Sequence, residues 1–244
     1  MTTRSRSAPA TLVLTCEHAG NRIPRPYARL FAGERGVLAS HRGWDPGALP
    51  LARLLARRLR RPLLSTTWSR LLVEANRSPT NPRIWSRFTK ELPADERRLI
   101  LERYWRPHRR AVEEAVAAAA ARGGGAVHVA VHSFTPVMDG AVRSADVAFL
   151  FDSKRRCEAD LARRWGALLR QRAPQLRVRY NYPYRGNTDG LPTALRRRHP
   201  EPCYAGFELE VNQALLSRPG WRRVGEALAA SLAEALASAS ARRR

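Results

Sequence analysis

Short apolar runs alternate along this chain with longer stretches of helical periodicity. Runs typical of buried strands occupy residues 11–16, 63–67, 71–74, 126–132, 145–151, 176–180 and 204–211. Apolar residues recur at helical spacing over 45–60, 93–122, 158–172 and 218–239. Strands that alternate with helices predict an α/β fold with a mostly parallel central sheet and helices on both of its faces.

No internal repeat or Ser/Gly-rich linker divides the 244 residues, so a single domain over 1–244 is expected, with flexible ends at 1–10 and 240–244. No apolar run approaches the roughly 18–20 residues of a membrane span, and the N-terminal apolar run is too short for a secretory signal. The three cysteines lack paired spacing, which argues against disulfides and zinc knuckles. We therefore expect a cytoplasmic protein without a membrane partner; the pattern predicts no oligomeric state.

The net charge of +23 raises the question of nucleic-acid binding. Lysine occurs only at Lys90 and Lys154, and the arginines are spread along the whole chain instead of forming one basic arm. This distribution, together with heavy use of Ala and Leu, is typical of GC-rich coding. A weak, salt-sensitive affinity for polyanions is all that the charge itself predicts.

Polar residues near the ends of the predicted strands are the candidate functional residues, because ligands of open α/β sheets bind where strands end. His18 and His132 come at the ends of two apolar strands, and Asp45 opens a predicted helix. Two imidazoles and one carboxylate form a common ligand set for Zn²⁺ that leaves a position for water. Asp45 could equally be a helix N-cap, and His41 is a competing ligand.

Glu208 and Glu210 alternate on the 204–211 strand and so face the same side of the sheet. A carboxylate beside a metal-activated water can take its proton, which makes Glu210 a candidate general base. The alternative is that these glutamates pair with arginines at a sheet edge.

Three further positions suit an anionic substrate. Asn76 and Arg77 follow a predicted strand, where an arginine can grip a carboxylate with two hydrogen bonds. Arg185 lies in a glycine-containing loop of the kind that covers ligands, and Arg70 precedes the 71–74 run. Any one of these arginines could instead be an ordinary surface residue.

Six segments in order give the chain a resemblance to the N-formylglutamate amidohydrolase family. They are LTCEHAGNRIP at 14–24, HRGWDPGA at 41–48, SRLLVEANRSP at 69–79, VHSFTP at 131–136, NYPYRGNTDG at 181–190 and FELEVNQALL at 207–216. The resemblance extends from about residue 11 to 230. It implies a fold similar to zinc-dependent carboxypeptidase-like (phosphorylase/hydrolase-like) hydrolases, and metal-dependent cleavage of an amide on an acidic amino acid.

By the same resemblance, His18 and His132 match the zinc-binding histidines, Asp45 the acidic position of the second motif, and Glu210 the general base. Asn76 and Arg77 match the Asn-Arg pair that holds a substrate carboxylate. The carboxypeptidase pattern places a glutamate three residues after the first histidine, where this chain has asparagine. The third ligand is therefore Asp45, or else Glu17 or His41.

The expected activity is hydrolysis of an N-formyl or N-acyl acidic amino acid, such as N-formylglutamate, with Zn²⁺ or another divalent cation. Glu210 acts as the base, Arg70 stabilises the oxyanion, and Arg77 and Arg185 hold the carboxylates of a small anionic substrate. Two alternatives remain: a metal-dependent amidase or carboxypeptidase-like enzyme for another small acylated amino acid or peptide, and an Arg-rich nucleic-acid-binding protein without catalysis.

Overall fold

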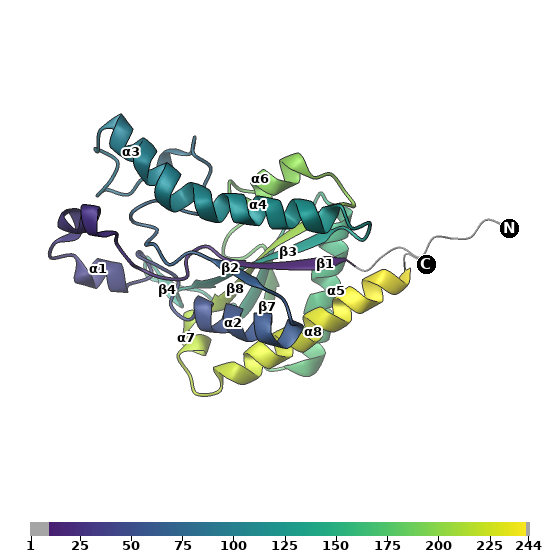
Figure 1. Cartoon of the computed structure of the whole chain (residues 1–244). Coiled ribbons are helices and arrows are strands. Elements are labelled where there is room, and N and C mark those ends of the chain that lie inside the picture. Colours follow the sequence, from purple (N-terminus) through teal and green to yellow (C-terminus); the bar gives the residue numbers. More distant parts are fainter. Residues whose placement is uncertain (1–9, 243–244) are drawn as a thin grey trace.

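The computed structural model describes residues 10–242, with side chains to residue 238, and is built around a six-stranded sheet of order β2-β1-β3-β8-β6-β7 (Figure 1). Its strands are β1 (Thr11–Cys16), β2 (Leu63–Ser65), β3 (Ala126–Phe134), β6 (Val147–Leu150), β7 (Val178–Tyr180) and β8 (Tyr204–Asn212). β2, β1, β3 and β8 are mutually parallel, whereas β6 pairs with β8 antiparallel. The predicted mostly parallel sheet is confirmed.

Helices cover both faces, and the alternation of side chains along the strands determines what each face packs against. On one face, α2 (Ala48–Leu59), α5 (Arg156–Arg172) and α8 (Trp221–Arg242) bury the largest apolar cluster. On the other, α4 (Arg106–Ala120) and α6 (Leu191–Arg198) bury a smaller one. Figure 1 shows α4 on one side of the sheet and α2 with α8 on the opposite side.

β8 illustrates this division of the two faces. Phe207, Leu209 and Val211 belong to the large apolar cluster. Glu208 and Glu210, at the alternate positions, point to the face that α4 and α6 cover only in part. This second face therefore carries the polar residues of the sheet.

The remaining elements are short. They are α1 (Arg35–Ala39), α3 (Ala94–Ile100), α7 (Gln213–Leu216), the 3-10 helices η1 (Arg25–Phe31) and η2 (Pro82–Ile84), and the hairpin β4 (Val137–Met138) with β5 (Ala141–Val142). α3 lies within the helix expected over 93–122, whereas α6 and the other short elements were not predicted. Among the described residues, no helix is long and apolar enough to cross a membrane.

Several predicted elements differ from the observed ones. Residues 71–74 form a buried turn, because Leu72 N bonds to Ser69 O and Glu74 N to Ile84 O instead of to a strand. The helix expected over 45–60 begins at Ala48, after Gly47 in the left-handed conformation with φ 82°. The helix expected over 93–122 contains a π-helical segment, Leu101–Trp105, before α4, where Pro107 in the first turn supplies no N–H.

The ends of the chain also bear on the prediction. Of the flexible ends expected at 1–10 and 240–244, residues 1–9 and 243–244 lie outside the described residues. Helix α8, expected over 218–239, begins at Trp221 and continues to Arg242.

Trp165 joins the large apolar cluster to two helices, which yields a stability prediction. Its indole is fully buried, stacks 4.3 Å from the Phe149 ring, and donates to Ser231 of α8 at 3.1 Å. We expect Trp165→Ala to lower the free energy of unfolding by about 3–5 kcal/mol through the cavity it leaves. Arg163→Ala, on the exposed side of α5, should change it by less than about 0.5 kcal/mol. Urea denaturation of both variants measures the difference, and equal losses would contradict this packing.

Candidate active site and metal centre

The polar face of the sheet positions the candidate site through three strands. His18 follows β1 after Cys16 and Glu17, and His132 lies within β3, which continues two residues beyond the predicted end. Glu210 on β8 is directly opposite His132 in the parallel register. The tight strand pairing therefore fixes the separation of these groups.

His18, Asp45 and His132 form one buried cluster. One ligand atom from each lies within 4.8 Å of the others. Asp45 Oδ2 is 2.9 Å from His132 Nδ1 and 3.3 Å from His18 Nδ1, and the two ring centroids are 4.9 Å apart. Two imidazole nitrogens and a carboxylate oxygen thus lie close enough together to hold a divalent cation such as Zn²⁺.

A carboxylate lies next to the Nε2 atom of each histidine, on the side of the ring away from Asp45. His18 Nε2 contacts Glu74 Oε1, and His132 Nε2 lies 3.2 Å from Glu17 Oε2. The other oxygen of Glu17 is 3.3 Å from His108 Nε2. In a histidine that binds a metal, one ring nitrogen is the ligand, and the other usually donates a hydrogen bond to such a carboxylate. Both rings are thus oriented with Nδ1 toward Asp45.

These contacts bear on the alternatives for the third ligand. Glu17, although adjacent in sequence to His18, lies on the far side of the His132 ring from Asp45. His41 is only partly buried and, within residues 10–238, is not a member of the cluster that could hold an ion. The geometry favours Asp45.

Arg70 links the carboxylates of Asp45 and Glu74. Its guanidinium donates to Asp45 Oδ1 at 3.2 Å and to Glu74 Oε2 at 2.8 Å. Burial by itself would raise the pKa of Asp45, but His18, His132 and Arg70 hold this pKa well below its ordinary value. The pKa of Glu74 is lowered in the same way, chiefly by Arg70 and His18 against the effect of burial. Both carboxylates are therefore charged.

Glu210 differs from these paired acids. Its Oε2 is buried and has no hydrogen-bond partner among the described residues. Burial, helped by the charges of Asp45 and Glu208 and opposed by His132, raises the pKa of Glu210 to about 7. A carboxyl group with such a pKa can take up and release a proton near neutral pH.

A cavity of about 450 Å³ opens over this cluster. Along with His18, Asp45, Arg70, His132 and Glu210, it is lined by Asn76, Arg77, Arg83, Ser133, Leu150, Pro183, Tyr184, Arg185, Thr188, Asp189 and Glu208. All eight residues selected from the sequence thus reach one cavity. Its size is in the range of small-molecule sites.

The substrate-binding candidates differ in how they are held. Asn76 donates to Glu208 Oε1 at 2.7 Å and accepts from Leu191 N at 2.8 Å, so its amide fixes the 74–77 turn to α6. Arg77 donates one N–H to the carbonyl oxygen of Asp189. Within the described chain, the guanidinium of Arg185 has neither a hydrogen bond nor an ion pair.

Sequence reasoning missed Glu74, Arg83 and Asp189. Arg83 lies on η2 and lines the cavity with a guanidinium that, among residues 10–238, has no ion-pair partner. No local motif marks it, because its place depends on how the 78–85 segment folds back. Glu74 has one local signal, since it lies four residues after Arg70, with which it forms an ion pair, but its contact with His18 has none.

The comparisons with known proteins agree with this geometry. The family model described as N-formylglutamate amidohydrolase matches residues 10–217. Gene product Atu2144 from Agrobacterium tumefaciens is 30% identical, with 96% of this chain and 94% of that chain covered and a TM-score of 0.79. An N-formylglutamate amidohydrolase from Ralstonia eutropha JMP134 is 21% identical, with 94% and 95% covered and a TM-score of 0.67, a likeness of fold alone. No curated protein matches the chain.

The carboxylate behind His18 provides a test of the metal centre that does not depend on activity. Glu74→Gln keeps the shape of the side chain but removes the charge that orients the ring. We expect it to weaken zinc affinity by about 10–100-fold, as is usual for such outer carboxylates. Competition with a zinc chelator measures the affinity. Glu102→Gln, at an exposed i,i+4 pair with Arg106, is the control and should leave the affinity unchanged; equal affinities for all three proteins would refute the assignment.

Proposed function

The chain belongs to the N-formylglutamate amidohydrolase family, and from this premise we propose that it hydrolyses the amide of an N-formyl or N-acyl acidic amino acid, such as N-formylglutamate, at a zinc site. The family implies a hydrolase of linear amide C–N bonds that acts on a small acylated amino acid. The observation that carries the finer proposal is the convergence of His18, Asp45 and His132 beside the unpartnered carboxyl group of Glu210.

The residues fit a zinc ion. Their donor set of two imidazoles and one carboxylate is of the zinc type, and the carboxylates of Glu74 and Glu17 lie behind the two rings. Zinc held by His18, Asp45 and His132 would lower the pKa of a water molecule and polarise the carbonyl group of the scissile amide.

Glu210 moves the proton in this proposal. Its unpartnered Oε2 accepts a proton from the attacking water, and the resulting carboxylic acid then donates this proton to the leaving amine nitrogen. A pKa of about 7 suits both transfers, since neither the acid nor the base form is strongly favoured at neutral pH. Arg70, partly exposed to the cavity, would stabilise the negative charge that develops on the carbonyl oxygen.

Arginines at the opposite side of the cavity would bind the amino-acid part of the substrate. Arg77 is held by Asp189 O through one N–H, which leaves its other donors in a fixed position for a carboxylate. Arg185 supplies a second guanidinium for the second carboxylate of a glutamate moiety. Asn76 supports this arrangement by holding the turn that carries Arg77.

The proton-transfer role of Glu210 is testable by Glu210→Gln. The amide has nearly the same volume but cannot accept a proton, so we expect kcat for N-formylglutamate to fall by about 10²–10⁴-fold. Zinc content and the unfolding transition should stay those of the wild type. Glu226→Gln, which removes an exposed partner of Arg58, is the matched control. Near-normal turnover by Glu210→Gln would remove Glu210 from the mechanism.

A further inference from the structure

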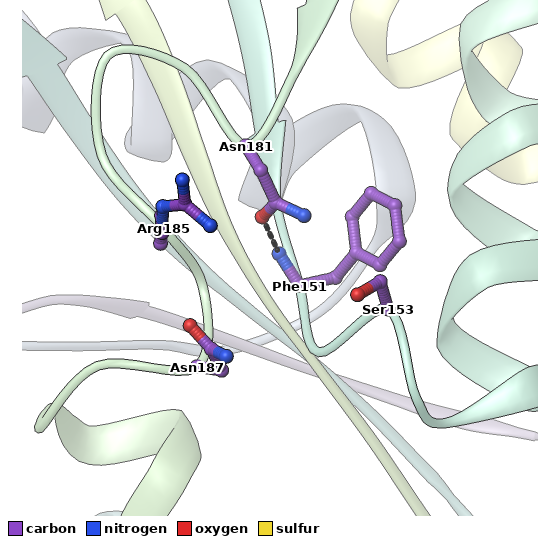
Figure 2. A pocket seen from close by; sticks show the side chains of 5 residues that line it. All are labelled: Phe151, Ser153, Asn181, Arg185 and Asn187. Carbon is purple, nitrogen blue, oxygen red and sulfur yellow. Dashed lines mark hydrogen bonds between the residues drawn. The ribbon is translucent and has the colours of Figure 1, made fainter.

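A second, smaller cavity adjoins the active site. It has a volume of about 260 Å³ and is lined by Phe151, Ser153, Asn181, Arg185 and Asn187 (Figure 2). Arg185 lines this cavity and the larger one as well, so the two share a wall. A ligand that occupies both cavities would have to pass along this arginine.

The lining of the second cavity consists mostly of hydrogen-bond donors. Asn181 Oδ1 already accepts from Phe151 N at 3.0 Å and Gly186 N at 3.1 Å, so its NH₂ group is the part left for a ligand. The side chains of Ser153, Asn187 and Arg185 have no hydrogen-bond or ion-pair partner in the described part of the chain. No lining residue carries a carboxylate. Free donors around a guanidinium, without a competing anion, suit a carboxylate group.

The strand register places this cavity away from the reacting centre. Glu210 pairs with Ala148, whereas Leu150 pairs with Glu208, which lies two residues before Glu210 in β8. Phe151, the first wall residue of the second cavity, comes one residue beyond Leu150. At about 3.3 Å per strand residue, the second cavity begins about 10 Å from Glu210.

This separation sets the length of the ligand. One extended residue spans at most about 3.3–3.6 Å, so about three residue lengths are needed to cover the distance. A single acylated glutamate can reach Arg185 on the shared wall, but it is too short to extend from Glu210 past Arg185 to Ser153 and Asn187. A peptide of two or three residues with a terminal carboxylate has the required length and charge.

We propose that the cavity formed by Ser153, Asn181, Arg185 and Asn187 binds the terminal carboxylate of a short acidic peptide whose acylated end lies at Glu210. The inference rests on the proposed function for the reacting end of this ligand. It extends the substrate class from acylated amino acids to acylated di- and tripeptides.

Isothermal titration calorimetry with glutamate, diglutamate and triglutamate tests the proposal, because these probes need no turnover. We expect triglutamate to bind the purified wild-type protein at least about tenfold more tightly than glutamate. Ser153→Phe fills the cavity from an exposed position and should abolish this gain. Ser153→Ala leaves the space open and should keep the gain within about twofold. Glutamate affinity should be the same in all three proteins.

Two results would overturn the proposal: equal affinities for the three probes in the wild type, or a Ser153→Phe effect as large on glutamate as on triglutamate. A separate assay of N-formylglutamate and N-formyl-triglutamate hydrolysis distinguishes the two hypotheses. Length-dependent binding that Ser153→Phe abolishes, without hydrolysis of either compound, supports the peptide subsite and refutes the proposed function. Hydrolysis of N-formylglutamate with length-independent binding does the reverse.

Discussion

The cluster of buried charges around Asp45 is the constraint on which the rest of the site depends. The carboxylates of Glu17, Asp45 and Glu74 are buried; the guanidinium of Arg70 pairs with Asp45 and Glu74, and Glu17 lies against the imidazoles of His108 and His132. With neutral imidazoles, two negative charges remain unbalanced in a region from which water is largely excluded, and unbalanced buried charge costs several kcal/mol. A divalent cation held between the two histidines would supply the missing charge. The same deficit accounts for the raised pKa of His132, which the nearby carboxylates produce against the effect of burial.

The sheet accommodates these buried charges because alternate residues of a strand point to opposite faces, which keeps the polar side chains apart from the apolar ones. Along β8, Phe207 and Leu209 belong to the large apolar cluster, and Glu208 and Glu210 face the cavity. A register shift of one residue would exchange the two sets and place carboxylates against α5 and α8. The many apolar contacts behind the sheet therefore also hold the carboxyl group of Glu210 near His132.

The sequence predicts those parts of the fold and the site whose residues lie close together along the chain. Alternating runs predict the sheet and its long helices, and strand ends lead to His18 and His132, because these signals lie within a few residues of each other. Residues 71–74 were predicted as a strand because the first three are apolar, but the backbone N–H groups of Leu72 and Glu74 bond to Ser69 and Ile84. The pairing of Glu74 with His18 and the place of Arg83 depend on contacts between distant segments, which no single-sequence pattern records.

The arginines around the cavity divide into two groups that the net charge alone does not reveal. Arg70 and Arg77 are held by acceptors of the protein, and in the part that the structure describes Arg83 and Arg185 have none. A guanidinium that is paired with carboxylates, as that of Arg70 is, gains less from a ligand anion than one that is unpaired or held only by a carbonyl oxygen, as that of Arg77 is. Under the proposed function, selectivity for carboxylates would therefore reside at Arg77, Arg83 and Arg185.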